Sequence, residues 1–170
     1  MSDRVRESVF AMLGSHYGTP GRLPPIHVAD VFSGSGSMGI EAVSRGAASC
    51  RFYERGRIAL AALTQNLESV GIEARPHIER RDAWRWAITG RDEVPFDLVL
   101  LDPPYREATD TTVAGRVRSY LRRLAPAVDT GALVVLHHPR STAYDLESDD
   151  PWRVCDVRTL GSHGLTVFQR

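Results

Sequence analysis

One segment, from Phe96 to Tyr105, limits what this chain can fold into more than any other. Residues 98–101 (LVLL) form an apolar run that follows Asp97 and ends at Asp102. An apolar run without alternation is typical of a strand that is buried on both faces of a parallel sheet. Open α/β sheets bind their ligands beyond the carboxyl ends of such strands. The segment therefore predicts a parallel α/β sheet with a binding loop that begins at Asp102.

The loop Asp102-Pro103-Pro104-Tyr105 combines hydrogen-bond acceptors with an aromatic face. The prolines lack N–H donors, and the first one holds Asp102 in an extended conformation, so we expect outward-facing carbonyls beside a carboxylate. This corner fits an NH2 group on a planar base, which Tyr105 would cover by stacking. Acceptors that draw the amine hydrogens out of the ring plane would return the lone pair to nitrogen. The loop therefore predicts an amine-methylation site, although Asp-Pro also opens many ordinary turns.

The composition is that of one globular domain with balanced charge. We expect a single domain over the 170 residues, with a helix and loop at 1–24 and a Rossmann-like core at 25–170. All 21 basic residues are arginine, and 21 acidic residues bring the net charge to zero, so bulk charge does not indicate a nucleic-acid partner. The arginines concentrate in two segments, each more typical of a solvated surface: Arg75, Arg80, Arg81, Arg85 and Arg91, and then Arg116, Arg118, Arg122 and Arg123.

The remaining special residues indicate neither a membrane nor a metal. No signal peptide and no apolar run long enough to span a membrane is present, so we expect a cytoplasmic protein. Cys50 and Cys155 lie outside any redox or metal spacing, and we expect both to be small buried side chains. His137 and His138 have no partner ligands at helical or loop spacing, so we expect structural or surface histidines and no metal site.

Apolar periodicity along the chain alternates between the two kinds of element. It predicts strands at 26–32, 50–54, 74–81, 96–101, 131–137, 154–160 and 165–169, and helices at 2–13, 37–46, 58–70 and 111–124. This alternation is typical of a doubly wound, Rossmann-like α/β fold. We expect a mostly parallel seven-stranded sheet with an antiparallel C-terminal strand.

A glycine-rich loop follows the first predicted strand. Gly34 and Gly36 would let the backbone approach a ligand at a helix N-terminus, although the G-x-G-x-x-G pattern alone is weak. Glu54 strengthens it, because an acid about 20 residues beyond the glycines, at the end of the next strand, is where a ribose-binding carboxylate belongs. A nucleoside-containing cofactor is indicated. Asp82 follows the third strand, where it could accept from an adenine amine or cap a helix.

The pairing of Asp30-Val31-Phe32-Ser33-Gly34-Ser35-Gly36 with Asp102-Pro103-Pro104-Tyr105 resembles class I S-adenosylmethionine-dependent methyltransferases that modify exocyclic amines. Residues 2–7 (SDRVRE) and 39–47 (GIEAVSRGA) are similar to the bacterial RsmD family, which are 16S ribosomal RNA guanine-N2 methyltransferases. The resemblance is strongest before Glu54 and around Asp102, and it is weak after Leu136. Relatives usually carry a basic segment ahead of the motif at Ser2, and many have an acid near position 137.

The resemblance implies a site and a substrate. S-adenosylmethionine, with S-adenosylhomocysteine as product, would lie with its methionine end near Asp30, Ser33, Gly34 and Gly36, its ribose at Glu54, and its adenine at Asp82 and Ala83. The target guanine, flipped from its stack, would be bound by Asp102, Pro103, Pro104 and Tyr105, of which Asp102, Pro103 and Tyr105 would be catalytic. The substrate would be guanine 966 of 16S RNA on a 30S subunit or assembly intermediate, with the enzyme a monomer that needs no metal.

Three other functions compete with this interpretation. A DNA adenine-N6 methyltransferase would use the same acceptor corner for a different amine. A nicotinamide dehydrogenase could be built on Gly34, Gly36 and Gly39, but it would leave the Asp102 loop without a role. A cofactor- or RNA-binding module could keep this fold without activity, because fold does not fix function.

Overall fold

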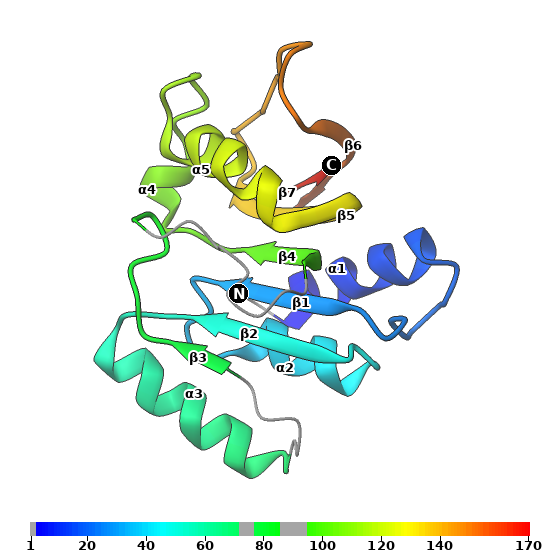
Figure 1. Cartoon of the computed structure of the whole chain (residues 1–170), viewed down its shortest axis with the longest axis vertical. Coiled ribbons are helices and arrows are strands. Elements are labelled where there is room, and N and C mark those ends of the chain that lie inside the picture. Colours follow the sequence, from blue (N-terminus) through cyan, green and yellow to red (C-terminus); the bar gives the residue numbers. More distant parts are fainter. Residues whose placement is uncertain (1–2, 72–76, 86–94) are drawn as a thin grey trace.

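The computed structural model describes residues 3–71, 77–85 and 95–170, and within them it forms a seven-stranded sheet with helices on both faces (Figure 1). The strands are β1 His27–Val31, β2 Ser49–Tyr53, β3 His77–Glu79, β4 Phe96–Leu101, β5 Val128–Pro139, β6 Arg153–Leu160 and β7 His163–Gln169. The helices are α1 Asp3–His16, α2 Ser37–Ser44, α3 Arg57–Ser69, α4 Tyr105–Ala108, α5 Arg116–Leu124 and the short 3-10 helix η1 Ala125–Ala127.

The strand order is β3-β2-β1-β4-β5-β7-β6, with β7 antiparallel to both of its neighbours and β1 to β5 parallel. The predicted fold class is therefore confirmed. The chain reverses its direction of winding between β1 and β4, and ligands of open α/β sheets bind at such a switch point. The register pairs Val31 with Tyr53 on one side and with Leu101 on the other. Phe32, Glu54 and Asp102 consequently lie side by side, directly beyond the carboxyl ends of β1, β2 and β4.

Two hydrophobic cores cover the two faces of the sheet. Helices α1, α2 and α3 pack on one face, where β4 contributes Leu98 and Leu100. Helix α5 packs on the other face, where β4 contributes Val99 and Leu101. Because successive side chains of a strand point to opposite faces, a strand between two cores is apolar throughout. This is why residues 98–101 read as an unbroken apolar run.

The helix predicted over 111–124 is wrong in its first part. Asp110 Oδ1 accepts hydrogen bonds from the Thr112 amide (3.2 Å) and hydroxyl (2.7 Å), and this local turn competes with helix formation. The helix begins only after Gly115, at Arg116. The short helix α4, directly after the proline pair, was not predicted.

The prediction for Cys155 is also wrong, because its side chain is exposed while that of Cys50 is buried. Cys155 lies on β6, an edge strand whose register shifts between Val154 and Asp156, so both faces of the strand meet solvent there. Of the strand predicted over 74–81, residues 77–79 form β3, while 74–76 fall outside the described residues, as do Arg75 and Arg91. Within the described part of the chain, no helix is long and apolar enough to cross a bilayer.

Candidate active site

A cavity of about 360 Å³ lies at the carboxyl ends of the central strands, and we call it the site cavity. Its walls include Glu54 from the end of β2, Ala83, and all four residues of the loop from Asp102 to Tyr105. Two parts of the predicted cofactor site are thus brought together with the predicted methylation loop. The other predicted cofactor residues do not line this cavity, although they lie close in sequence to residues that do. These are Asp30, Ser33, Gly34, Gly36 and Asp82.

Asp30 anchors the glycine-rich loop from below. Its side chain is 2% exposed, and Oδ2 accepts a hydrogen bond from the Gly39 amide at 2.8 Å. Burial raises the pKa of Asp30 to about 7; the Gly39 hydrogen bond opposes this rise, and the charges of Asp102 and Glu54 add to it. The carboxylates of Asp102 and Glu54 therefore lie close enough to disfavour a negative charge on Asp30.

The glycines of the loop serve two different purposes. Gly36 has φ +80°, and a Cβ there would lie 2.2 Å from Leu63 Cδ1; a Cβ on Gly39 would lie 2.4 Å from Phe52 Cε1. These two glycines let α2 and α3 approach β2. Gly34 also has positive φ, but a Cβ there would meet nothing within 4 Å. The space beside Gly34 is open, and the buried Ser33 hydroxyl next to it has no hydrogen-bond partner within the described chain.

Glu54 ties the end of β2 to the glycine-rich loop. Its Oε2 accepts from the Gly34 amide at 2.9 Å, and Oε1 accepts from the amides of Arg55 and Gly56 at 2.8 and 2.6 Å. These three hydrogen bonds hold the carboxylate at the wall of the site cavity.

Asp82 closes a local turn over residues 83–85. Its Oδ1 accepts from the Trp84 amide at 3.1 Å, and Oδ2 accepts from Arg55 Nη1 at 2.8 Å. Both carboxylate oxygens are therefore engaged, and Ala83 rather than Asp82 faces the cavity.

Sequence reasoning did not identify Phe32 and Trp84 as site residues. Phe32 has φ 61°, a left-handed conformation that no other non-glycine residue in the described ranges adopts. Strain of this kind costs about 1–3 kcal/mol and concentrates at functional sites. The Phe32 ring packs on that of Trp84, with centroids 4.8 Å apart, and both line the cavity. Trp84 Nε1 donates to Glu107. A half-buried aromatic pair on a cavity wall offers a surface for a planar group.

Asp102 is held by a histidine from the neighbouring strand. Asp102 Oδ1 lies 2.7 Å from Nδ1 of His137, which is 4% exposed at the end of β5. Because a carboxylate only accepts hydrogen bonds, Nδ1 of His137 must carry the hydrogen. The second oxygen, Oδ2, has no partner among the described residues, and the Asp102 side chain is 29% exposed. One face of the carboxylate is fixed and the other is available to a ligand.

His137, His163 and Tyr105 form a triangle behind Asp102. The Tyr105 hydroxyl lies 2.5 Å from His163 Nδ1 and 3.2 Å from His137 Nε2, and the two nitrogens are 2.9 Å apart. Two bare nitrogens at that distance would repel, and so would two N–H groups, so the facing nitrogens share one hydrogen. This condition is met with both rings neutral, or with one further proton on His137. The triangle therefore holds the His137 ring in place, while the Asp102 carboxylate fixes the hydrogen on its Nδ1.

The acceptor corner at residues 102–105 has fewer free hydrogen-bond acceptors than the sequence predicted. The Pro104 carbonyl accepts from the amides of Glu107 (2.8 Å) and Ala108 (3.2 Å), because it begins helix α4. The expectation of a free Pro104 carbonyl is thus wrong. The Pro103 carbonyl accepts no backbone hydrogen bond within the described residues. Two acceptors remain for a ligand, Asp102 Oδ2 and the Pro103 oxygen.

The adjacent histidine has a different role. His138 is fully buried, its Nδ1 bonds to the Pro139 carbonyl at 2.8 Å, and its Nε2 bonds to the Thr166 hydroxyl at 2.8 Å. His138 is structural, as expected, whereas His137 belongs to the site. In the described ranges, no group of three or more His, Cys, Asp or Glu side chains is placed to hold a metal ion.

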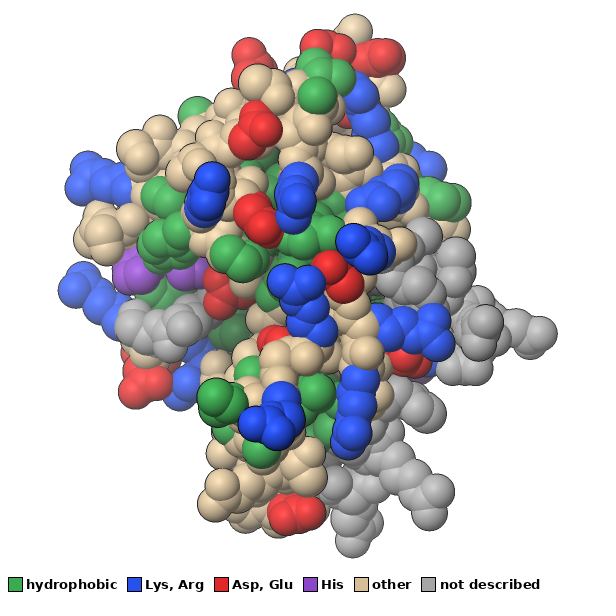
Figure 2. All heavy atoms as spheres, turned by 90° about the vertical axis from the view of Figure 1, so that its left-hand side faces the viewer, with side chains coloured by type: hydrophobic (Ala, Val, Ile, Leu, Met, Phe, Trp, Pro, Cys, Tyr) green, Lys and Arg blue, Asp and Glu red, His purple; other side chains and the backbone are tan. Residues whose placement is uncertain are grey.

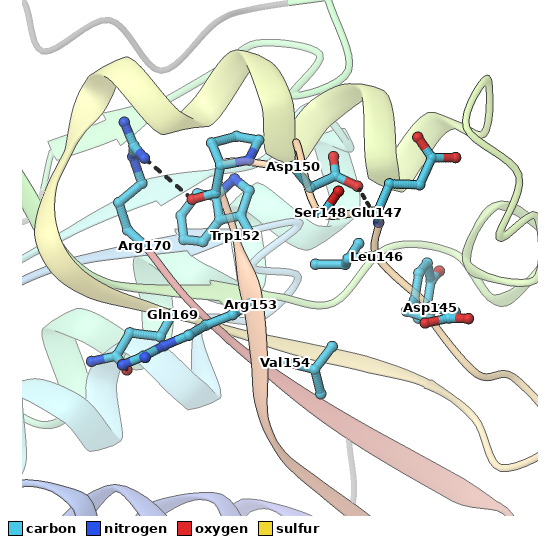
Figure 3. A pocket seen from close by; sticks show the side chains of 12 residues that line it. Asp145, Leu146, Glu147, Ser148, Asp150, Trp152, Arg153, Val154, Gln169 and Arg170 are labelled. Carbon is cyan, nitrogen blue, oxygen red and sulfur yellow. Dashed lines mark hydrogen bonds between the residues drawn. The ribbon is translucent and has the colours of Figure 1, made fainter.

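A larger cavity, of about 700 Å³, lies away from this site between the loop 144–152 and the C-terminal end of β7 (Figure 3). We call it the C-terminal cavity. Asp150 on its wall, 3% exposed, accepts from Arg118 Nη2 at 2.6 Å and from Arg122 Nε at 2.9 Å. It also accepts from the Glu147 amide at 3.1 Å, and Trp152 donates to the Leu121 carbonyl. These bonds fasten the loop to α5 and leave the Asp150 carboxylate saturated.

Comparison with known proteins supports the family suggested by the sequence. Residues 1–169 match the family model described as "Conserved hypothetical protein 95". "Putative rRNA methyltransferase YlbH" of Bacillus subtilis is 36% identical over 175 residues, which cover 99% of this chain and 86% of that protein. "Ribosomal RNA small subunit methyltransferase D" of Buchnera aphidicola is 30% identical over 62% of this chain and 51% of that protein. A conserved hypothetical protein from Streptococcus pyogenes superposes with a TM-score of 0.75 at 26% identity, covering 93% and 94% of the two chains.

Proposed function

The chain belongs to the RsmD family, and from this premise we propose that it transfers a methyl group from S-adenosylmethionine to the N2 amine of a guanine in small-subunit ribosomal RNA. The observation that carries the proposal is the acceptor corner at Asp102 and Pro103, which opens into the same cavity as Glu54 and Ala83. By family resemblance the target is guanine 966 of 16S RNA in a 30S subunit or assembly intermediate.

The residues around the cavity fit this cofactor. S-adenosylmethionine supplies an electrophilic methyl carbon on a sulfonium cation. The charge of Glu54 disfavours a second negative charge on Asp30, so a cation beside these two groups would be stabilised. The Ser33 hydroxyl and the open face of Gly34 can hold the polar methionine end, and Glu54 the ribose hydroxyls. A nicotinamide cofactor would instead leave the Asp102 loop without a role.

The aromatic and backbone groups suit the adenine ring. Phe32 and Trp84 offer ring surfaces, and Ala83 lies beside them on the cavity wall. Asp82 remains part of this proposal, because each of its carboxylate oxygens accepts one hydrogen bond and has room for a second from the adenine amine.

The acceptor corner would orient the amine for attack. Asp102 Oδ2 and the Pro103 carbonyl accept its two hydrogens, while the ring of Tyr105, which is 40% exposed, stacks on the base. Turning the hydrogens toward these acceptors frees the nitrogen lone pair. After the nitrogen has gained the methyl group it must lose one proton, and Asp102 Oδ2 is placed to hold that proton and release it to solvent. His137 acts as a positioning residue because it fixes Oδ1.

The names of the relatives support RNA rather than DNA as substrate, since both of those described above are rRNA methyltransferases by name. The acceptor corner by itself would accommodate adenine N6 equally well. The two alternative substrates can be distinguished by an assay with methyl-labelled S-adenosylmethionine. The protein is incubated with either small-subunit RNA or adenine-containing duplex DNA. We expect label in the RNA only. Label in DNA would favour the adenine-N6 alternative, and no label in either would favour a module without activity.

A further inference from the structure

Two arginine-rich segments that are separate in the sequence converge beside the site cavity. A groove of about 460 Å³ is lined by Arg55, Arg85, Arg116 and Arg123, and we call it the arginine groove. Arg85 comes from the first arginine-rich segment, and Arg116 and Arg123 come from the second. Trp84 and Arg55 line both the groove and the site cavity, so the two spaces adjoin.

The arginine groove carries more positive charge than its acids balance. Asp82 pairs with Arg55 at 2.8 Å, and Glu107 pairs with Arg116 at 3.0 Å. Arg85 and Arg123 have no carboxylate partner within the described residues; Arg123 Nη2 donates to the neutral Trp84 carbonyl at 2.9 Å. Figure 2 views this edge of the sheet, and arginine side chains are spread across its middle. Since the whole chain has zero net charge, the excess here is a local feature.

The arginines of helix α5 face two different sites, the C-terminal cavity and the arginine groove. Arg118 and Arg122, four residues apart on one face, are engaged by Asp150 at the C-terminal cavity. Arg116 and Arg123 line the arginine groove instead, together with Ala114 at the start of the helix. The N-cap residue, Gly115, provides no side-chain cap, so the first amides of this nine-residue helix add partial positive charge at the same place.

We propose that the arginine groove binds the phosphate backbone of the RNA beside the target guanine. The inference rests on the proposed function, which it deepens by naming a second contact surface. A base that is flipped into a cavity leaves its flanking phosphates at the rim, and the groove adjoins that rim. Guanidinium groups match phosphate oxygens with two parallel hydrogen bonds. Phosphate contacts position a nucleic acid without reading its sequence, so the groove sets register while the site cavity selects the base.

The test compares two double variants that change charge equally. Arg85→Gln/Arg123→Gln removes the two groove arginines without a carboxylate partner. Arg153→Gln/Arg158→Gln removes two arginines from β6, at the opposite end of the strand order. Binding of a fluorescent hairpin RNA with an unpaired guanine in its loop is measured by anisotropy over a series of salt concentrations. Each lost phosphate contact reduces the slope of log affinity against log salt by about 1.

We expect the groove variant to lose affinity several-fold and its salt slope to fall by about 2, while the β6 variant matches the wild type. Cofactor affinity, measured by calorimetry, should be unchanged in both. Equal RNA binding and slope in the groove variant would overturn the inference, and so would an equal loss in the β6 variant. If the wild type methylates RNA but the groove variant binds it normally, only the groove assignment fails. If the wild type methylates no RNA, the proposed function itself fails.

Discussion

The two cavities of this molecule differ in how completely their polar groups are satisfied. The C-terminal cavity is about twice as large, at about 700 Å³ against about 360 Å³, but its buried acid, Asp150, is saturated by two arginines and an amide. Beside the site cavity, Phe32 is strained, the Ser33 hydroxyl lacks a partner in the described chain, and Asp102 keeps one oxygen free. Strain and unsatisfied groups persist where a ligand uses them. Volume alone would favour the C-terminal cavity, whereas the strained and unsatisfied groups favour the site cavity.

The largest expected effect is on turnover, which should depend on the site cavity and not on the C-terminal cavity. Asp102→Ala removes the acceptor that orients the amine, so we expect turnover to fall by about 10³-fold or more while cofactor affinity stays nearly unchanged. Asp145→Ala, on the wall of the C-terminal cavity, is the matched control and should keep wild-type turnover. Single-turnover methyl transfer and calorimetry measure the two quantities. Near-normal rates in Asp102→Ala would remove Asp102 from the proposed site.

The second expected effect concerns the C-terminal cavity, where a substitution should change stability and leave turnover unaffected. Asp150→Ala leaves the buried Arg118 guanidinium without its partner, and we expect the free energy of unfolding to drop by about 3–5 kcal/mol in urea titrations. Turnover per folded molecule should not change. A loss of turnover without a loss of stability would show that the C-terminal cavity contributes to the reaction.

The same variant gives a pH test. Burial alone would raise the pKa of Asp150, but hydrogen bonds from Arg118, Arg122 and the Glu147 amide outweigh it and leave the pKa below its ordinary value. A lowered pKa in the folded state means that the stabilisation is present above the ordinary carboxyl pKa and is lost as the pH falls through the folded value. The stability difference between wild type and Asp150→Ala should therefore shrink in acid.

A smaller effect tests how Asp102 is held. A hydrogen bond to a charged group contributes about 1.5–3 kcal/mol, so His137→Leu should lower kcat by about 10–100-fold, with little change in cofactor affinity. In His137→Asn the side-chain amide can replace the Nδ1 donor, and we expect it to recover most of the loss. A packing role alone would predict that leucine performs as well as asparagine. The imidazole nitrogen signals of His137 in NMR spectra should show the Nδ1–H form.

The smallest expected effect is a change in how the free energy of unfolding depends on pH. The pKa of Asp30 is raised to about 7, so between about pH 4 and 7 the folded state holds a proton that the unfolded state has released. Wild-type stability should consequently decline with rising pH in that window, by at most about 1.4 kcal/mol per pH unit. Asp30→Asn keeps an oxygen that can accept from the Gly39 amide and should flatten the decline. Urea titrations across the window measure it, and equal slopes would contradict the assignment.

The residues that the sequence located correctly share one property. Glu54 ends one predicted strand and Asp102 directly follows another, so their places at the strand ends are readable without coordinates. His137 carries the same signal, since it follows the apolar run that ends at Leu136, which pairs with Leu101. The sequence around His137 lacks the spacing of a metal site, but it does not indicate a hydrogen-bond partner on another strand.

The residues that sequence reasoning missed depend on contacts between distant elements. His163 reaches Tyr105 only through the antiparallel register of β7. The left-handed conformation of Phe32 is imposed by tertiary structure and leaves no mark in the sequence. The arginine groove likewise requires that α5 be placed beside the segment after β3. The predicted start of the helix at 111–124 is wrong for the opposite reason, because the local turn at Asp110 overrides the apolar pattern.

The most direct test of the account identifies the atom that receives the methyl group. Small-subunit particles that lack the modification are incubated with labelled S-adenosylmethionine and the wild type, Asp102→Ala or Asp145→Ala, and the nucleosides are then separated by mass spectrometry. We predict N2-methylguanosine with the wild type and with Asp145→Ala, and none with Asp102→Ala. Label on another atom, or N2-methylguanosine formed as readily by Asp102→Ala, would contradict the assignment of the site cavity as the place of methyl transfer.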